Sequence, residues 1–441
     1  MKFPWPNNRS TSHEAAGDPV AGSGRKHRFR SLSRPRTALV ALPLAAIIGV
    51  GGFFISSLAS SHVSAADAAD AAGTAISANS ARLVSDDADD AITPLHTRGA
   101  DIVDAAGKTV TITGVNWFGL ETGTFAPDGL WARNYKSMIN QIVASGFNAI
   151  RLPYSNALFQ PGKNTPNGID YALNPDLQGL AGLPLMDKIV HAATSRGLMV
   201  ILDQHRPDQN GQSCLPYSGD LSEQQWIADW AMLAEHYRDN PLVIGADLHN
   251  EPCDPATWGT GNPQTDWRLM AEQAGDAILK VNPNWLVIVE GVSSNDGQST
   301  WWGGDLAAAK AYPVQLSEPD HLVYEAHDYG PDVYNQPWFL AQNFPANLAG
   351  IWNANWAYLS EQNIAPVLLG EFGGSVGDTT EGVWQKTLVA FLKQHHISYT
   401  YWCMNPNSGD TGGVLDNDWK TVDQAKLNLL HTYMAPLLKQ Q

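Results

Sequence analysis

Cysteine is scarce in this chain of 441 residues, which holds only Cys214, Cys253 and Cys403. Three cysteines are too few for a small fold built on several disulfides. No CxxC pair and no spaced Cys/His set occurs, so no structural zinc site is expected. The motifs HxH and HExxH are also missing, so no catalytic zinc site is expected either. In an oxidising compartment, this number predicts one disulfide and one free thiol.

Positive charge is also scarce once the first 36 residues are set aside. The formal net charge is −17, although residues 1–36 carry eight Lys and Arg against two Asp and Glu. The rest of the chain is therefore strongly acidic and would repel a phosphate backbone, so nucleic acid is not expected as a partner. A neutral ligand would be indifferent to this charge.

One long apolar run follows the basic segment 1–36. Residues 37–61 (TALVALPLAAIIGVGGFFISSLASS) contain no charged side chain, and the run is long enough to span a bilayer. Val63 and Ala65 have the spacing of a signal-peptidase site. Cleaved export and a retained single-pass anchor both stay open, and either places the acidic body outside the cytoplasm because positive charge stays inside. We expect a secreted protein, with a membrane-anchored one as the alternative and membrane contact only through 37–61.

The remaining sequence divides into a spacer and a folded domain. Residues 62–95 are rich in Ala, Ser and Asp and have few large apolar side chains, which is typical of a disordered spacer. The folded domain is expected over 96–441. It begins with two alternating runs around an Ala–Gly turn within 99–119, a pattern that predicts a short β-hairpin.

Eight apolar runs of strand length recur along the folded domain. They cover residues 111–117, 148–154, 198–205, 241–249, 285–291, 321–327, 366–371 and 398–403. Helix-length segments with apolar residues three and four apart lie between them, and one opens with Ser222 and Gln225 in capping-box spacing. Eight nearly continuous apolar strands, each followed by a helix, predict parallel strands buried on both faces and hence an α/β fold of the (β/α)8 TIM-barrel class. A doubly wound sheet would need a glycine-rich phosphate turn after its first strand, and none is present.

Polar or aromatic side chains stand where these apolar runs end. In such a barrel the carboxyl ends of the strands form one rim, where chemistry gathers. Two of the rim residues are carboxylates, Glu251 and Glu371, and a pair facing across a barrel mouth suits glycoside hydrolysis. The alternative is that both are buried ion-pair partners of Arg151 or of a histidine. The rim residues are Arg151, His205, Asn250, Glu251, His327, Tyr329, Glu371 and Trp402.

An ordered set of motifs at these positions resembles glycoside hydrolase family 5. The motifs are IRLPYS, LHNEP, HDYGP, LLGEFGG and YWCMNP, and they fall in a stretch of about residues 96–438 over which the resemblance extends. GVNWFGLET near the start and HRPD after the third apolar run are similar to the bacterial endo-β-1,4-glucanases of that family.

The resemblance implies a retaining double displacement. Glu251 would be the general acid/base and Glu371 the nucleophile, with the two carboxyl groups about 5–5.5 Å apart. Arg151 would keep Glu371 ionised, and Asn250 would bind the sugar 2-hydroxyl.

The resemblance also assigns the remaining rim residues. His205 and His327 match the two histidines of the glycone-side subsite, and Tyr329 matches a tyrosine hydrogen-bonded to the nucleophile. Trp402 matches the tryptophan floor under the sugar, with a cis peptide bond expected between Trp402 and Cys403.

Other aromatic residues are weaker candidates for sugar stacking. Trp131, in a GLW stretch that resembles the family's, is the best of them. Four more tryptophans lie in loops expected on the same rim: Trp258, Trp301, Trp302 and Trp338. Leu248 and His249, just before the rim, are expected to be structural.

The two cysteines Cys214 and Cys253 fall in neighbouring rim loops where family members do not place cysteines together. We therefore expect a disulfide between them, fixing the loop behind Glu251. Cys403 is expected to be a buried free thiol.

The sequence thus predicts an exported, monomeric endo-β-1,4-glucanase that needs no cofactor and no metal. A β-mannanase or a xyloglucanase would use the same catalytic pair. From another class, a non-catalytic glycan-binding surface protein would be expected to have lost a rim residue, whereas all eight are present. No carbohydrate-binding module is evident after the last expected helix, which favours soluble or amorphous glucan as the substrate.

Overall fold

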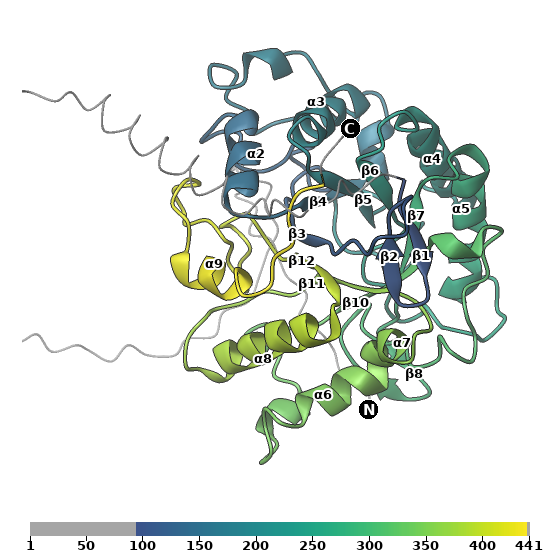
Figure 1. The fold of residues 1–441 in the computed structure, drawn as a ribbon. Helices are drawn as coiled ribbons and strands as arrows, with labels where there is room; N and C mark the ends of the chain where they lie inside the picture. Colours follow the sequence, from purple (N-terminus) through teal and green to yellow (C-terminus); the bar gives the residue numbers. More distant parts are fainter. Residues whose placement is uncertain (1–93, 439–441) are drawn as a thin grey trace, which may run out of the picture. The chain divides into compact units, whose positions relative to one another are not determined.

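The fold is a closed barrel of eight parallel strands, seen in a computed structural model that describes residues 94–438. Around the barrel the strands run β3, β4, β5, β6, β7, β10, β11 and β12, and β12 pairs with β3 to close it. This confirms the predicted barrel (Figure 1). The expectations for segments 1–36, 37–61 and nearly all of 62–95 lie outside the described residues. Within 94–438, no helix has both the length and the apolar character needed to cross a membrane.

Each barrel strand coincides with one of the predicted apolar runs. The strands are β3 (Thr113–Asn116), β4 (Ala149–Ser155), β5 (Met199–Arg206), β6 (Val243–Asp247), β7 (Leu286–Glu290), β10 (Leu322–His327), β11 (Val367–Glu371) and β12 (Ser398–Tyr401). Almost every strand residue is buried, because helices cover the outer face and side chains fill the inside.

Helices surround the strands in Figure 1. They are α2 (Tyr135–Ala144), α3 (Leu183–Thr194), α4 (Glu223–His236), α5 (Trp267–Val281), α6 (Leu348–Trp352), α7 (Tyr358–Glu361), α8 (Thr380–His395) and α9 (Gln424–Leu430). The predicted capping of α4 is present, since the hydroxyl of Ser222 accepts a hydrogen bond from the N–H of Gln225 at 3.2 Å. Such a cap satisfies one of the free N–H groups at the helix start.

The expectation of a helix after every strand is wrong at one place. Between β7 and β10 the described chain has the small hairpin of β8 (Ser294–Asn295) and β9 (Gln298–Ser299) and the short turn η3 (Pro319–His321), but no α-helix. This connection contains Gly297 and Gly303, both with a positive φ, and such residues interrupt a helix.

The predicted hairpin is present, but its strands lie earlier than the sequence pattern suggested. β1 (His96–Arg98) pairs antiparallel with β2 (Asp101–Val103) around Gly99. Gly99 has φ +60°, and a Cβ there would lie 2.3 Å from Asn363 Oδ1, so glycine is required in this turn. The expected Ala–Gly turn follows it and is joined only by a single bridge between Val103 and Thr109.

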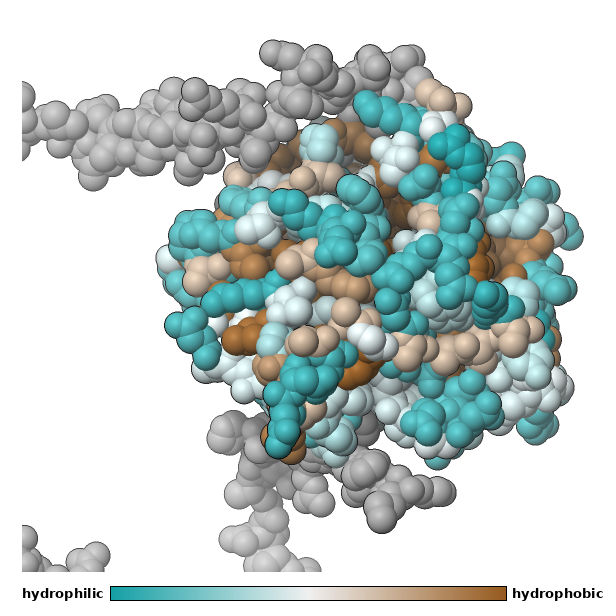
Figure 2. Space-filling model, turned by 60° about the horizontal axis from the view of Figure 1, so that its bottom comes forward, coloured by the Kyte–Doolittle hydropathy of each residue, from teal (hydrophilic) through white to brown (hydrophobic). Residues whose placement is uncertain are grey.

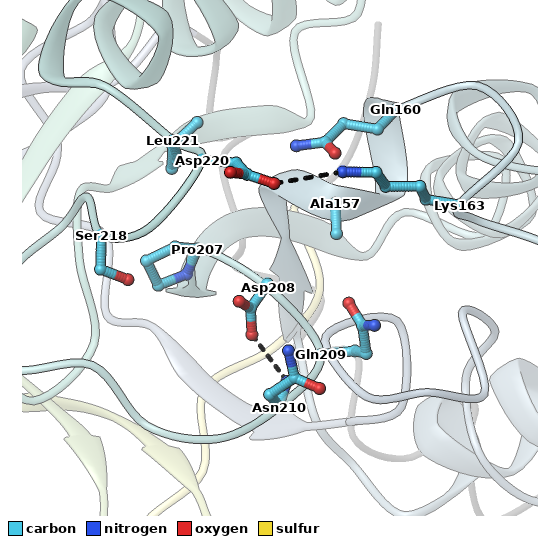
Figure 3. A pocket seen from close by; sticks show the side chains of 10 residues that line it. All are labelled: Ala157, Gln160, Lys163, Pro207, Asp208, Gln209, Asn210, Ser218, Asp220 and Leu221. Atoms are coloured by element: carbon cyan, nitrogen blue, oxygen red, sulfur yellow. Dashed lines mark hydrogen bonds and ion pairs between the residues drawn. The ribbon is translucent and has the colours of Figure 1, made fainter.

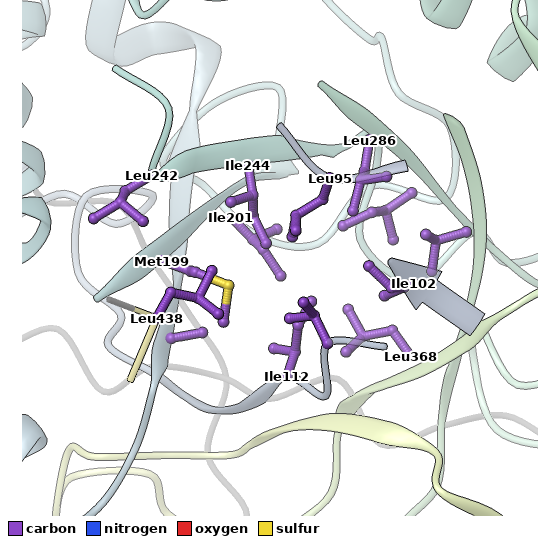
Figure 4. Close-up of a cluster of buried hydrophobic side chains, with 14 residues drawn as sticks. Leu95, Ile102, Ile112, Met199, Ile201, Leu242, Ile244, Leu286, Leu368 and Leu438 are labelled. Carbon is purple, nitrogen blue, oxygen red and sulfur yellow. The ribbon is translucent and has the colours of Figure 1, made fainter. Parts of the chain in front are cut away.

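One end of the barrel is closed by hydrophobic side chains (Figure 4). They come from the amino-terminal ends of the strands, from the hairpin and from the last described residue: Leu95, Ile102, Val110, Ile112, Ala149, Met199, Ile201, Leu242, Ile244, Leu286, Ile288, Val323, Leu368 and Leu438. This apolar floor leaves the carboxyl ends of the strands as the end available for polar chemistry.

The surface seen in Figure 2 is mostly polar, with hydrophobic side chains showing in separate patches. The large hydrophobic side chains that are exposed are scattered along the described chain: Trp131, Leu173, Tyr312, Leu340 and Ile364. Isolated exposed side chains of this kind are normal on a folded domain and by themselves mark no interface.

Candidate active site

The eight predicted rim residues come together at the carboxyl end of the barrel. Arg151 lies in β4, His205 in β5, Asn250 and Glu251 just after β6, His327 at the end of β10, Tyr329 two residues later, Glu371 at the end of β11 and Trp402 just after β12. Hydrogen bonds, ion pairs and ring contacts link them into one group.

Glu371 is the most firmly held carboxylate of the group. It is 3% exposed, and Oε1 accepts a hydrogen bond from Arg151 Nη1 at 2.7 Å, while Oε2 accepts one from the hydroxyl of Tyr329 at 2.7 Å. Burial alone would raise the pKa of Glu371, but the positive charges of His327 and Arg151 outweigh it and lower the pKa below its usual value. Glu371 is therefore ionised at neutral pH.

Glu251 stands opposite in a different environment. Its backbone has φ +55°, its side chain is 21% exposed, and Oε1 lies 3.3 Å from His327 Nδ1. Burial raises the pKa of Glu251 above its usual value, although His327 opposes the shift. A carboxylate oxygen of Glu251 and one of Glu371 lie within 4.8 Å of each other, which is short of the roughly 6.5–9.5 Å between the carboxyl groups of inverting glycosidases.

Arg151 is the centre of a buried charge cluster that sequence reasoning missed. Its guanidinium contacts Asp203 at 3.1 Å, Asp247 at 2.6 Å and Glu325 at 3.5 Å, in addition to Glu371. All of these acids but Glu371 are fully buried. A signal was present in the sequence, because Asp203, Asp247 and Glu325 each interrupt an otherwise apolar run shortly before the run ends. The shared partner, Arg151, lies on another strand and could not be identified from any one of these runs.

Burial raises the pKa of most carboxyl groups in this cluster. Burial raises the pKa of Asp203 to about 7 and that of Glu290 to about 8, against the opposing charges of Arg151 and His327. Burial also raises the pKa of Glu325 well above its usual value. Arg151 and His327 cannot neutralise five buried carboxylates, so the acids compete for protons and Glu371 is left as the group with a lowered pKa.

The two histidines of the rim differ in charge. Burial lowers the pKa of His205 well below its usual value, and its Nδ1 lies 2.7 Å from Asp203 Oδ2. Burial also opposes a charge on His327, but Glu290 and Glu371 outweigh it and raise its pKa well above the usual value. A neutral imidazole and an imidazolium thus stand at the same end of the barrel.

The aromatic candidates differ in how much of each ring is free. Trp402 is half-buried beside the nearly parallel rings of Phe118, at 5.3 Å, and His205, at 5.5 Å. Its peptide bond to Cys403 is cis, as expected. Trp131 is 42% exposed and lies edge-on to Trp419.

Two of the weaker tryptophan candidates are wrong as stacking platforms. Trp258 is 3% exposed and Trp301 is 2% exposed, so neither presents a face to a ligand. The indole N–H of Trp258 donates to the carbonyl of Tyr312, and Trp301 packs edge-on against Tyr329. Trp302 and Trp338 are half-buried.

Behind Glu251, the loops after β5 and β6 are tied together. Cys214 and Cys253 form the expected disulfide, and Cys403 is a buried free thiol. His249 is fully buried between Gln204 and the carbonyl of Ser213, which fits its expected structural role.

Three overlapping groups within the described chain bring carboxylate and imidazole atoms close enough to surround a cation: Asp203, His205 and Glu371; Glu251, His327 and Glu371; and Glu290, Glu325 and His327. Arg151 and His327 already supply positive charge to these acids, and the geometry gives no reason to assign a metal.

A separate cavity of about 130 Å³ lies among the loops after β4 and β5 (Figure 3). Its lining includes the exposed ion pair of Lys163 and Asp220, at 3.4 Å, and it contains no aromatic ring and none of the rim residues. The chemistry therefore belongs to the barrel rim and not to this cavity.

Known proteins match this chain over the stretch that forms the barrel and its rim. A family model described as cellulase (glycosyl hydrolase family 5) matches residues 103–408. The chain is 51% identical over 360 residues to an endoglucanase of Paenibacillus polymyxa, covering 80% of this chain and 90% of the relative. It is 45% identical over 338 residues to the major extracellular endoglucanase of Xanthomonas campestris pv. campestris, covering 75% and 69%.

A solved structure agrees with these relatives. The hyperthermophilic endocellulase from the archaeon Pyrococcus horikoshii is 43% identical, with a TM-score of 0.73, over 77% of this chain and 99% of that one. With most of the chain matched by the family model and by relatives of this identity, it belongs to the cellulases of glycosyl hydrolase family 5.

Proposed function

We propose that this protein is an exported, retaining endo-β-1,4-glucanase, with Glu371 as nucleophile and Glu251 as general acid/base. The observation that carries the proposal is the difference between the two carboxyl groups. Glu371 is held ionised by the positive charges of His327 and Arg151, whereas the pKa of Glu251 is raised and its oxygen lies within 4.8 Å of Glu371. When two neighbouring carboxyl groups have divergent pKa values, the ionised one can act as nucleophile and the protonated one as acid.

In the first step Glu371 attacks the anomeric carbon while Glu251 gives its proton to the leaving glycosidic oxygen. The C–O bond to the leaving sugar breaks and a glycosyl ester forms on Glu371. In the second step Glu251 takes a proton from water, whose oxygen attacks the same carbon and releases Glu371 as a carboxylate. The sugar leaves with its original anomeric configuration, and Glu251 is protonated again.

The other rim residues would serve binding and orientation. Asn250, whose Oδ1 accepts a hydrogen bond from Arg151 Nη2 at 3.0 Å, is proposed to bind the sugar 2-hydroxyl through its amide. His205 and His327 would line the glycone side, and Trp402 would form the floor under the sugar at the cleavage point. Trp131 would add a stacking surface farther along the chain of sugars.

The substrate is proposed from the relatives. Those described above are called endoglucanases or an endocellulase, and the P. horikoshii enzyme has been solved with cellotetraose. A β-1,4-glucan therefore fits best, with β-mannan and xyloglucan as alternatives for the same catalytic pair. Export is proposed from the apolar run 37–61 and from the relative called extracellular, with the catalytic domain at 96–441.

The proposal is tested by measuring reducing-sugar release from carboxymethylcellulose, β-mannan and β-1,3-glucan with the wild type and with Glu371→Gln. We expect turnover of the cellulose derivative alone, abolished by the substitution. Turnover of mannan, equally abolished, would keep the mechanism and replace the substrate. Activity that survives Glu371→Gln would contradict the assignment of the nucleophile.

A further inference from the structure

Glu290, at the end of β7, is linked to Glu251 directly and through His327. Its Oε2 accepts a hydrogen bond from the backbone N–H of Glu251. Its Oε1 forms an ion pair of 2.6 Å with His327 Nε2, and His327 Nδ1 in turn lies 3.3 Å from Glu251 Oε1. The contacts close a ring that runs from the backbone of Glu251 through Glu290 and His327 to the carboxyl group of Glu251.

From this ring we propose that Glu290 is a positioning residue for the acid/base Glu251, an inference that rests on the function proposed above. The ring fixes both ends of the Glu251 side chain, its backbone and its carboxyl oxygen. Glu290 therefore sets where the proton-donating oxygen stands relative to the glycosidic oxygen. It is fully buried and acts through Glu251 and His327.

The surroundings of Glu290 are built to keep it in this place. The residue is fully buried, so water cannot replace the hydrogen-bond partners of its two oxygens. Gly303, in the loop after β7, has no side chain where a Cβ would lie 2.4 Å from Glu290 Oε1. The backbone carbonyl of Glu290 accepts a hydrogen bond from the indole of Trp267 at 2.8 Å.

Glu251 also needs this support more than an ordinary residue would. Its φ of +55° lies in the left-handed region, which a residue with a side chain occupies only when its surroundings hold it there. The hydrogen bond from its N–H to Glu290 is one such restraint. Glu290→Gln leaves one oxygen to accept from this amide but turns an NH2 group toward His327 Nε2 in place of an acceptor. The link through His327 is then broken, and the carboxyl group of Glu251 is free to move.

The test compares two substrates that differ in their need for an acid. 2,4-Dinitrophenyl β-cellobioside has a leaving group that departs without protonation, whereas phenyl β-cellobioside needs a proton from Glu251. We expect Glu290→Gln to lower kcat/KM for the phenyl substrate by roughly ten- to a hundredfold, since small misplacements of a reacting group have effects of this size. The value for the dinitrophenyl substrate should stay close to wild type.

The ratio of the two kcat/KM values is independent of the fraction of protein that is folded. Glu381→Gln is the matched control, because Glu381 is another buried carboxyl group that accepts a backbone N–H, that of Asp332 at 2.9 Å, and it lies outside the ring. We expect its ratio to equal that of the wild type. If Glu290→Gln does not fold, Glu290→Asp, which is too short to reach both partners, replaces it in the same measurement.

Equal losses on both substrates, or no loss on either, would overturn the role of Glu290. Glu251→Gln separates this outcome from a failure of the proposed function. If Glu251→Gln loses activity selectively on the phenyl substrate and Glu290→Gln does not, only the inference about Glu290 is wrong. If Glu251→Gln shows no selectivity, the acid/base assignment itself is wrong.

Discussion

At the scale of single residues, the sequence indicated which groups stand at the rim but not which of them hold protons. Arg151, Glu251 and Glu371 were found because each stands at or near the end of an apolar run. Asp247 and Glu290 lie no farther from the ends of their runs than Arg151 does. They were missed because a lone acid there is read as part of the strand, whereas Arg151 belongs to the motif IRLPYS. Their protonation depends on neighbours from other strands, chiefly Arg151 and His327, and no single segment of sequence contains that information.

A first prediction concerns the hydroxyl of Tyr329. Tyr329→Phe removes the 2.7 Å hydrogen bond to Glu371 Oε2, which helps to lower the pKa of Glu371. Without it, that pKa rises, so the acid limb of the pH profile of kcat/KM moves to higher pH. The loss of a hydrogen bond to a charged group should lower kcat/KM at the optimum by about ten- to a hundredfold.

The control for this prediction is Tyr399→Phe. Tyr399 is also a buried tyrosine, but its hydroxyl donates to the carbonyl of Tyr433 at 2.8 Å, away from the rim. Its pH profile should match the wild type. An unchanged acid limb in Tyr329→Phe would show that this hydroxyl does not tune Glu371.

At the scale of elements, all eight barrel strands could be predicted because each is a buried apolar run. The helix expected after β7 could not, since glycines and a small hairpin occupy that connection. The hairpin of β1 and β2 was displaced in the prediction because Gly99, and not the later Ala–Gly pair, takes the tight turn. Periodicity identifies long elements well, whereas the position of a turn depends on which glycine the packing selects.

A second prediction concerns the disulfide that joins the loops after β5 and β6. Cys214 and Cys253 are 39 residues apart in sequence, and a cross-link of this span restricts the unfolded chain. The double substitution Cys214→Ser with Cys253→Ser should lower the free energy of unfolding by about 2–4 kcal/mol in urea.

The wild type should lose the same free energy of unfolding when it is transferred from oxidising to reducing buffer. The control Cys403→Ala should also lose it on that transfer, because Cys403 takes no part in the bond. Equal stability of wild type and double variant would mean that the cross-link does not restrain the unfolded chain.

At the scale of the whole molecule, the barrel separates an apolar floor from a charged rim. The floor closes one end with hydrophobic side chains alone (Figure 4), while the opposite end buries acids that outnumber their cationic partners. The arrangement places the polar chemistry at one end of the barrel and makes the free energy of unfolding depend on pH.

A third prediction follows for stability as a function of pH. Burial raises the pKa of Asp203, Asp328 and Glu121 to about 7, well above the values of about 4 in an unfolded chain. The folded state therefore holds protons that the unfolded state has already lost. Because stability falls with pH wherever the folded state binds more protons, the free energy of unfolding should decrease from pH 6.5 to 8.5.

His327 acts in the same direction, since its raised pKa keeps a proton that an unfolded histidine loses above about pH 6.5. His205 and His249, whose pKa values are lowered, oppose the trend only below that pH. The measurement is urea unfolding at several pH values in constant salt. A free energy of unfolding that rises over pH 6.5 to 8.5 would contradict this protonation scheme.

The central claim is that Glu371 forms a covalent glycosyl intermediate, and trapping that intermediate tests it most directly. The protein is incubated with 2,4-dinitrophenyl 2-deoxy-2-fluoro-β-cellobioside, which lets the glycosyl ester form but slows its hydrolysis, and is then digested and examined by mass spectrometry. We predict one fluorocellobiosyl group per molecule, on the peptide that contains Glu371. A label on any other residue, or turnover of the reagent with inversion and no label, would contradict the account.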